Sequence, residues 1–159
     1  MKVIFLDVDG VLNYIKTEAR APSGTLGIAS APVKQLRNIV KETGAFIVLT
    51  STWKEDWEFD EERCTPDGQY LVRKLKREGL HILDKTHDRV SDRGHGIRDW
   101  LNRHPGTDFW VVLDDDIFPD YEECGIMPHL VQSSIGANGL NAELAAKAIK
   151  ILTEGEKHA

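Results

Sequence analysis

The residues Lys2-Val3-Ile4-Phe5-Leu6-Asp7-Val8-Asp9-Gly10 predict a buried strand that ends in two carboxylates. A short run of β-branched and large apolar side chains, closed by glycine, is typical of a strand in a parallel sheet. Because side chains alternate along a strand, Asp7 and Asp9 leave it on the same side, at the end where open α/β sheets bind ligands. Two like charges this close indicate a divalent metal or acid/base chemistry. On these residues alone, acids that merely cap a loop are an equally good interpretation.

The length of the chain favours one globular domain, and its charge and hydropathy bear on what it binds. Its 159 residues can bury a core without disulfides, and we expect a single unit over residues 1–159. No stretch is long enough to span a bilayer, and the first residues lack the shape of a signal peptide, so we expect no membrane association. The net charge of −6 disfavours general attraction to nucleic acid, although a local basic patch could still bind it.

Cysteine and histidine spacing predicts neither a disulfide framework nor a zinc site. Cys64 and Cys124 are isolated and form no CxxC pair, which favours a reduced, cytoplasmic setting. The six histidines show no HxH or HExxH spacing. We therefore interpret them as solvated or locally hydrogen-bonded side chains.

Strand and helix patterns alternate after the opening strand. Residues 13–29 have no sustained period and predict a long, flap-like loop over the strand end. Ser30 is the expected N-cap of a helix that ends before Gly44. A second apolar run over residues 45–50 then ends in Thr50-Ser51-Thr52. This order predicts a βαβ unit with a right-handed crossover.

Residues 53–79 predict a small insert between the second and third strands. The insert begins with a short helix whose two tryptophans share a face, and we expect both rings to pack in a lid or core. A helix then starts near Thr65 and ends near Gly79, followed by a short strand over residues 80–83.

A further helix, which ends at His104-Pro105-Gly106, follows the basic and glycine-rich segment Ser91-Asp92-Arg93-Gly94-His95-Gly96. The free N–H groups of a helix N-terminus attract anions, Gly94 permits close approach, and Arg93 adds a positive charge. An N-cap by Ser91 or Asp92 explains the same pattern equally well.

A third strong strand pattern, Phe109-Trp110-Val111-Val112-Leu113, ends in Asp114-Asp115-Asp116. Consecutive acids at a strand end are costly unless they are solvated or neutralised. They occupy the same topological position as Asp7 and Asp9, and this recurrence favours a functional role for both groups. A short strand over residues 129–132 and a last helix complete an α/β pattern with a central parallel sheet.

The polar groups at these strand ends are suited to metal-assisted phosphoryl transfer. Mg²⁺ prefers a few carboxylates together with water and phosphate oxygens, so Asp7 and an acid after the third strand could hold it. Asp7 could attack phosphorus to give an aspartyl-phosphate, while Asp9 moves the protons. Thr50 could donate a hydrogen bond to the transferring group, and Arg93 could offset its charge.

The sequence resembles the haloacid dehalogenase (HAD) superfamily of aspartyl-nucleophile phosphohydrolases. Three superfamily motifs match Asp7-Val8-Asp9-Gly10-Val11-Leu12, Ile47-Val48-Leu49-Thr50 and Val111-Val112-Leu113-Asp114-Asp115. The resemblance implies that Asp7 is the nucleophile and a magnesium ligand. It also implies that Asp9 is the acid/base and binds magnesium through its backbone carbonyl. The implied fold is a three-layer α/β/α Rossmann-like HAD fold with at most a small cap insert.

The remaining metal ligand and the third-motif cation are less closely matched. Asp115 is the preferred ligand and Asp114 the alternative, with Asp116 as an outer neighbour. The superfamily usually has lysine in the third motif, and here Arg93 is the better candidate, with Lys85 as the alternative.

A branch of the superfamily, the HAD domain found in Swiss Army Knife RNA repair proteins, resembles this chain in looser patterns. These are Arg93-Gly94, Thr50-Ser51-Thr52-Trp53-Lys54 and Gly139-Leu140. We expect four further residues to bind substrate, namely Gly10, Ser51, Lys54 and Gly94.

The resulting expectation is a cytoplasmic, Mg²⁺-dependent phosphatase. Only residues 13–29 and 53–79 could cover the site, so large phosphomonoesters, including nucleotides and nucleic-acid ends, should fit as well as phosphorylated small molecules. A phosphotransferase of the same fold and a non-catalytic module that binds a phosphorylated ligand are the alternatives. The sequence indicates no obligate protein partner and does not specify the physiological substrate.

Overall fold

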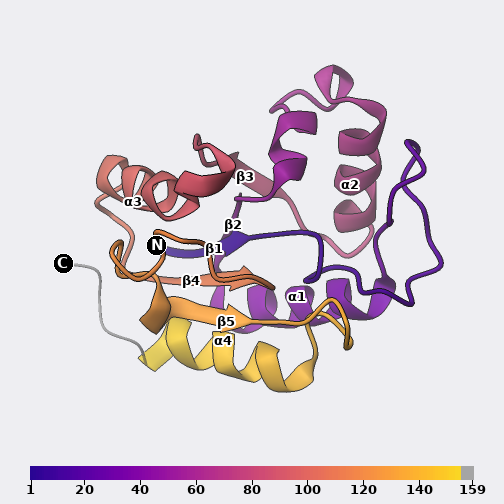
Figure 1. Cartoon of the computed structure of the whole chain (residues 1–159). Coiled ribbons are helices and arrows are strands. Elements are labelled where there is room, and N and C mark those ends of the chain that lie inside the picture. Colours follow the sequence, from indigo (N-terminus) through magenta and orange to yellow (C-terminus); the bar gives the residue numbers. More distant parts are fainter. Residues whose placement is uncertain (155–159) are drawn as a thin grey trace.

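A parallel sheet forms the centre of the computed structural model, which describes residues 1–154 (Figure 1). Its order is β3-β2-β1-β4-β5, and every pairing is parallel. The strands are β1 (Lys2–Leu6), β2 (Phe46–Leu49), β3 (Ile82–Lys85), β4 (Phe109–Asp114) and β5 (Leu130–Gln132). The opening strand of the chain is therefore the central strand of the sheet.

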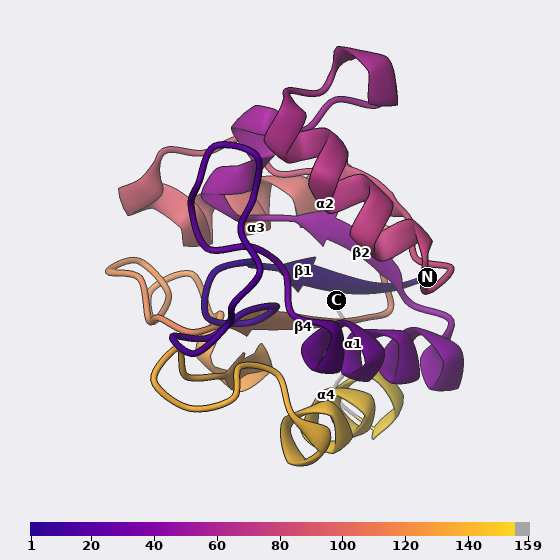
Figure 2. The same cartoon turned by 90° about the vertical axis from the view of Figure 1, so that its right-hand side faces the viewer.

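Helices cover both faces of the sheet, which confirms the expected three-layer α/β/α fold. Helices α1 and α4 pack against each other on one face, and α3 lies on the opposite face (Figures 1 and 2). The helices are α1 (Ser30–Thr43), α2 (Pro66–Lys76), α3 (Arg93–Arg103) and α4 (Ala142–Glu154). Single 3₁₀ turns are η1 (Thr52–Asp56), η2 (Glu61–Arg63), η3 (Val90–Asp92) and η4 (Met127–His129).

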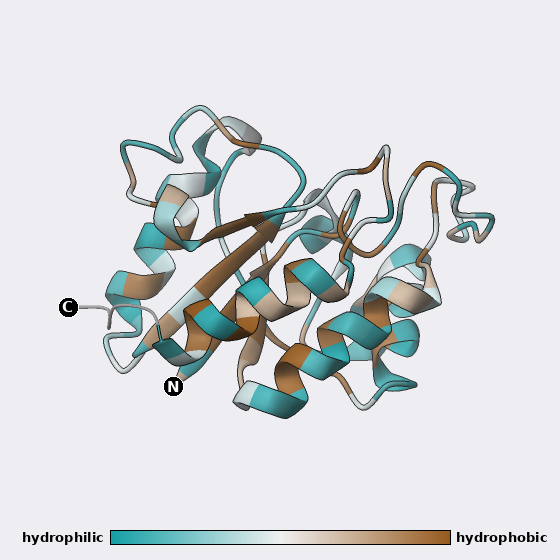
Figure 3. Cartoon of the chain, turned by 90° about the horizontal axis from the view of Figure 1, so that it is seen from below, coloured by the Kyte–Doolittle hydropathy of each residue, from teal (hydrophilic) through white to brown (hydrophobic). Residues whose placement is uncertain are grey.

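The alternating side chains of β1 hold the layers together. Ile4 and Leu6 belong to the core on the α1 and α4 side, whereas Val3 and Phe5 pack on the α3 side, where Phe5 meets Trp100 edge to face. Figure 3 shows the matching pattern on the helices, with apolar stripes separated by hydrophilic residues. Because both faces are covered, β1 is apolar and fully buried from Val3 to Leu6, up to the carboxyl edge.

Several element boundaries differ from the expectation; β5, for example, begins at residue 130 rather than 129. Helix α1 starts at Ser30 itself, and Ala29 takes the cap position because its N–H donates to the carbonyl of Leu12 and holds it extended. Strand β3 begins at residue 82 rather than 80, because the Leu80 N–H still donates to Leu75 in the turn that closes α2. By contrast, the Thr65 hydroxyl accepts from Gly68 N–H and caps α2 as expected.

The loop over residues 13–29 and the segment 53–79 contact each other. Ser23 donates from its N–H and hydroxyl to Asp67, and the Ile28 N–H donates to the Tyr70 hydroxyl. Both segments lie toward the side to which the β1 arrow points (Figure 1). The division of residues 1–159 into one domain with a flap-like loop and a small insert stays a prediction. Across residues 1–154, every helix is too short or too polar to cross a membrane.

Candidate active site

The carboxyl ends of the three central strands bring polar residues side by side. Asp7 follows β1, Thr50 follows β2, and Asp114 ends β4. The ladder continues through this edge, because Asp7 N–H donates to the Leu113 carbonyl and Thr50 N–H donates to the Leu6 carbonyl, each at 2.9 Å. The parallel register therefore places Asp7 between Thr50 at the end of one neighbouring strand and Asp114 at the end of the other.

Asp7 lies in a buried, strongly charged environment. Only 6% of its surface is exposed, and its carboxylate has one oxygen within 4.8 Å of oxygens of Asp114 and Asp115. Burial, and next the charge of Asp114, raises the pKa of Asp7 well above its usual value, while the charge of Arg93 acts in the opposite direction. Carboxylates whose pKa is strongly shifted by burial and neighbouring charges are common at catalytic sites.

Arg93 partly balances these acids from the first residue of α3. Its Nη1 lies 3.5 Å from Asp7 Oδ1 and 3.1 Å from Asp114 Oδ2. The guanidinium also stacks over the ring of Phe118, 4.0 Å from its centroid. Lys85, the alternative cation, instead donates to the backbone carbonyls of Lys54 and Trp57. Arg93 is thus the cation that the fold brings to Asp7.

Asp114 and Asp115 have different surroundings although they are adjacent. Asp114 is fully buried, and its carboxylate accepts hydrogen bonds from Arg93, the Tyr121 hydroxyl and the Asp116 N–H. Asp115 is half-buried, and burial raises the pKa of its carboxyl group. With three donors already on its carboxylate, Asp114 is suited to holding Arg93, whereas Asp115 is better placed to bind a cation.

The group of Asp7, Asp114 and Asp115 fits a hard divalent cation. One oxygen from each carboxylate lies within 4.8 Å of the others. Gly10 borders this space, since a Cβ at that position would collide with the Asp115 carboxylate. Mg²⁺ binds through one or two carboxylates and keeps several waters, so Asp7 and Asp115 together with solvent could complete its coordination.

The side chain of Asp9 is held by two donors that the sequence analysis did not assign to the site. Asn13 Nδ2 donates to Asp9 Oδ1 at 2.9 Å, and the Trp53 indole N–H donates to Asp9 Oδ2 at 3.2 Å. Asn13 is fully buried, accepts from the Gly10 N–H and donates to the Gly27 carbonyl. Trp53 is buried as expected, but its contact with a residue 44 positions earlier leaves no signal in the sequence.

Thr50 is the neighbour of Asp7 whose polar atom lacks a partner. Its side chain is fully buried, and its hydroxyl makes no hydrogen bond to any part of the described chain, residues 1–154. The next two residues predicted to bind substrate are already engaged. Ser51 Oγ accepts from the Trp53 N–H and caps η1, and Lys54 forms a buried ion pair with Asp88 at 2.5 Å.

The anion at the N-terminus of α3 is a side chain of the protein itself. Asp120, in the loop after β4, accepts from the N–H groups of Gly94 and His95 at 3.0 and 2.9 Å. The expected cap by the side chain of Ser91 or Asp92 is therefore wrong, although Asp92 occupies the N-cap position, and the Gly94 N–H already donates to Asp120. The sequence could not reveal this cap, since it joins residues 26 positions apart.

Replacing Asp120 by alanine should destabilise the protein by about 1–2 kcal/mol at neutral pH, as expected for a lost helix cap. Burial acts to raise the pKa of Asp120, but the donors of His95 and Gly94 outweigh it, so the pKa lies below its usual value. The stabilisation is therefore present above the ordinary carboxyl range and lost as the pH falls through the lowered pKa. Urea unfolding at neutral and acidic pH measures it, and an equal loss at both would contradict the assignment.

A family model described as the HAD domain in Swiss Army Knife RNA repair proteins matches residues 3–145. The chain belongs to this family. Comparison with curated proteins and with solved structures found no match. HAD domains are generally phosphohydrolases and usually use Mg²⁺, and this HAD domain has a parallel sheet and an acidic cluster that could bind a metal ion.

Proposed function

We propose that this HAD domain is a Mg²⁺-dependent phosphatase that hydrolyses phosphomonoesters through a phosphorylated Asp7. The observation that carries the proposal is the buried Thr50 hydroxyl, which has no partner within residues 1–154 and stands beside Asp7 at the sheet edge. A buried donor without a partner is costly, and a phosphoryl oxygen at Asp7 would satisfy it.

The residues around Asp7 and Asp9 are suited to a two-step displacement. An Asp7 oxygen attacks phosphorus, and the bond to the ester oxygen breaks as the Asp9 carboxyl gives that oxygen its proton. Water then attacks phosphorus, Asp9 takes up the proton, and the bond to Asp7 breaks to release inorganic phosphate. Mg²⁺ held by Asp7 and Asp115 would neutralise the phosphoryl charge and orient it for attack.

Arg93 and Asp114 support this chemistry by fixing the charge around Asp7. Asp7 and Asp114 both lie next to Nη1 of Arg93, while the buried Nε of Arg93 has no hydrogen-bond partner within the described chain. A guanidinium group that still has an unused N–H donor is well suited to donating a hydrogen bond to a phosphoryl oxygen. Tyr121 and Asp116 donate to Asp114, so the carboxylate that orients Arg93 is itself held in place.

We further propose that the physiological substrate is a phosphorylated RNA end. The family description, which refers to RNA repair proteins, supports this choice. The segments 13–29 and 53–79 are small covers compared with a separate cap domain, so a chain end could reach Asp7. Nucleotides and phosphorylated small molecules are the alternative substrates. Comparing phosphate release with and without alcohol acceptors distinguishes a phosphatase from a phosphotransferase.

A substrate panel with Mg²⁺ tests the proposed function. The panel compares 3′- and 5′-phosphorylated RNA and DNA ends, nucleotides, sugar phosphates and an aryl phosphate, with Asp7→Asn as the blank. We expect Mg²⁺-dependent phosphate release with the highest kcat/KM on an RNA end. Asp99→Asn, an exposed carboxylate paired with Arg103 on α3, is the matched control and should stay active. Tight binding of phosphorylated ends without turnover of any substrate would contradict catalysis.

Trp53→Phe should lower kcat by roughly 10-fold while KM changes little, because loss of the indole donor leaves Asp9 less well oriented for proton transfer. The matched control is Trp57→Phe, which removes an indole from the same segment. A loss of kcat that is equal in the two variants would show that packing, and not the contact with Asp9, is responsible.

A further inference from the structure

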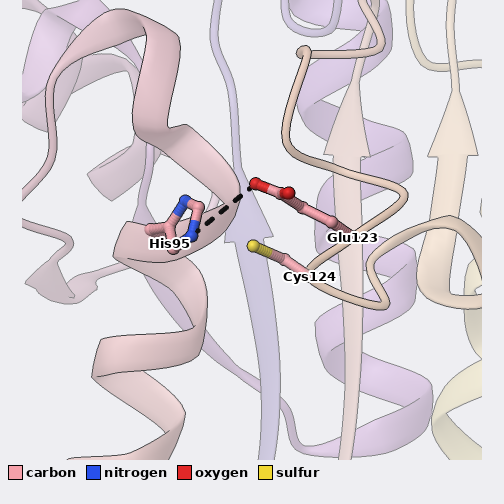
Figure 4. Close-up of side chains that lie close together, drawn as sticks. All are labelled: His95, Glu123 and Cys124. Atoms are coloured by element: carbon pink, nitrogen blue, oxygen red, sulfur yellow. Dashed lines mark ion pairs between the residues drawn. The ribbon is translucent and has the colours of Figure 1, made fainter.

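A second group of metal-ligating side chains lies outside the candidate active site. His95 is in the first turn of α3, and Glu123 and Cys124 are in the loop between β4 and η4. Figure 4 shows the three side chains directed toward one another across the gap between helix and loop. His95 Nε2 lies 3.7 Å from Glu123 Oε1, and one ligand atom from each of the three residues lies within 4.8 Å of the other two.

The imidazole of His95 is oriented for ligation through Nε2. Its Nδ1 lies 2.8 Å from Asp120 Oδ2, and Asp120 is fixed in turn by the backbone N–H groups of α3. A carboxylate that holds one imidazole nitrogen, so that the other faces the ion, is the usual support of a histidine metal ligand. Here the supported nitrogen leaves Nε2 facing Glu123 and the Cys124 thiol.

We propose that His95 Nε2, Cys124 Sγ and the Glu123 carboxylate bind a divalent transition-metal ion of the zinc class. Nitrogen, sulfur and oxygen ligands together suit Zn²⁺, whereas Mg²⁺ selects oxygen alone. Three protein ligands leave a fourth tetrahedral position for water. This site is distinct from the Asp7 group in both its residues and its metal preference, and it does not depend on the proposed phosphatase activity.

Only small movements are needed to form this site. With ligand bonds of about 2.0–2.3 Å, the ligand atoms of a tetrahedral zinc site lie about 3.3–3.7 Å apart. The nitrogen–oxygen pair is already at 3.7 Å, and the sulfur pairs lie within 4.8 Å. The side chain of Glu123 is 67% exposed and can turn freely, while His95 keeps its Nδ1 contact with Asp120 and needs to move by no more than about 1 Å toward the sulfur.

An ion at this position would join two elements that carry the candidate active site. Arg93 precedes His95 on α3, and the loop that holds Cys124 continues from the acids at the end of β4. An ion that binds only the folded chain stabilises it by RT ln(1 + [L]/Kd), so the stabilisation grows with the logarithm of the ion concentration. Binding should also release the thiol proton, because the thiolate is the ligand.

Cobalt substitution tests the site, because Co²⁺ bound to a thiolate gives a charge-transfer absorption that Co²⁺ bound only to oxygen ligands does not give. The chelator-treated full chain is titrated with Co²⁺ in excess Mg²⁺, then with Zn²⁺ as competitor. We expect one equivalent of Co²⁺ with the thiolate band and tetrahedral visible absorption, both removed by one equivalent of Zn²⁺. Asp7→Asn should give the same spectrum, which separates this site from the candidate active site.

Matched variants identify the ligands. Cys124→Ser should abolish the thiolate band, and His95→Gln should weaken Co²⁺ binding at least 10-fold. Cys64→Ser, which alters the other buried cysteine, should leave the thiolate band and the Co²⁺ affinity unchanged. Melting temperatures in chelator establish that each variant folds, and Zn²⁺ should raise the melting temperature of the unsubstituted chain but not of Cys124→Ser. Absence of the band, or its loss in Cys64→Ser only, would overturn the proposal.

Discussion

Replacement of Asp7 by asparagine is expected to reduce Mg²⁺-dependent phosphate release by about 10⁴-fold or more. The amide cannot attack phosphorus, and it removes a charged oxygen from the group that Asp115 would share with the metal. Phosphate release from an aryl phosphate, followed over time with Asp99→Asn as the control, measures the loss. Residual activity within 10-fold of the unsubstituted protein would show that Asp7 is not the nucleophile.

The same replacement should stabilise the metal-free fold at neutral pH, on the order of 1 kcal/mol. Burial and the charge of Asp114 raise the pKa of Asp7 in the folded state, so the folded chain binds this proton more tightly than the unfolded chain. The contribution of Asp7 to stability therefore decreases as the pH rises through this range. The advantage of Asp7→Asn should accordingly grow from acidic to neutral pH in a chelator.

Urea unfolding with and without Mg²⁺ separates these effects. Mg²⁺ should stabilise the unsubstituted chain, because it neutralises the buried carboxylates, and it should have much less effect on Asp7→Asn. A variant that is less stable than the unsubstituted chain at neutral pH in a chelator would contradict the electrostatic description of the site.

The second large effect is expected for Arg93→Met, which should lower the free energy of unfolding by about 3–5 kcal/mol at neutral pH. Arg93 is 4% exposed and lies between Asp7 and Asp114, so its removal leaves two buried carboxylates without their cation. Methionine removes the charge, and with it the stacking of the guanidinium on Phe118, while keeping an unbranched side chain that can pack against the same ring.

The sign of the pH dependence follows from the same contacts. Without Arg93, the lowering influence on the Asp7 pKa disappears, and the variant should lose stability more steeply as the pH rises. Arg103→Met is the control, because its exposed pair with Asp99 lies on the same helix. Arg93→Lys should be intermediate in stability, since it keeps the charge but not the planar donors. A loss below about 0.5 kcal/mol in Arg93→Met, typical of a surface position, would show that Arg93 does not balance the site.

The strand ends were predictable because they depend on local patterns. β1, β2 and β4 are apolar runs closed by polar residues, and parallel pairing places their ends at one edge. That rule placed Asp7, Thr50 and Asp114 together without further information. The family comparison confirms the predicted superfamily and its branch.

Contacts between distant loops were not predictable in the same way. Spacing rules for zinc sites detect ligands close in sequence, and His95 and Cys124 meet only because α3 begins beside the loop after β4. The cap of α3 by Asp120 depends on the same packing. The donors to Asp9 come from a loop and an insert, where composition does not encode position.

Trapping the phosphorylated protein tests the central claim most directly. Borohydride reduces an aspartyl-phosphate to homoserine, so a reaction with Mg²⁺ and phosphorylated substrate is quenched, reduced, digested and analysed by mass spectrometry. Homoserine at position 7 in the unsubstituted protein, and none in Asp7→Asn, is the predicted result. Turnover without homoserine at position 7, or homoserine at another aspartate, would contradict the role assigned to Asp7.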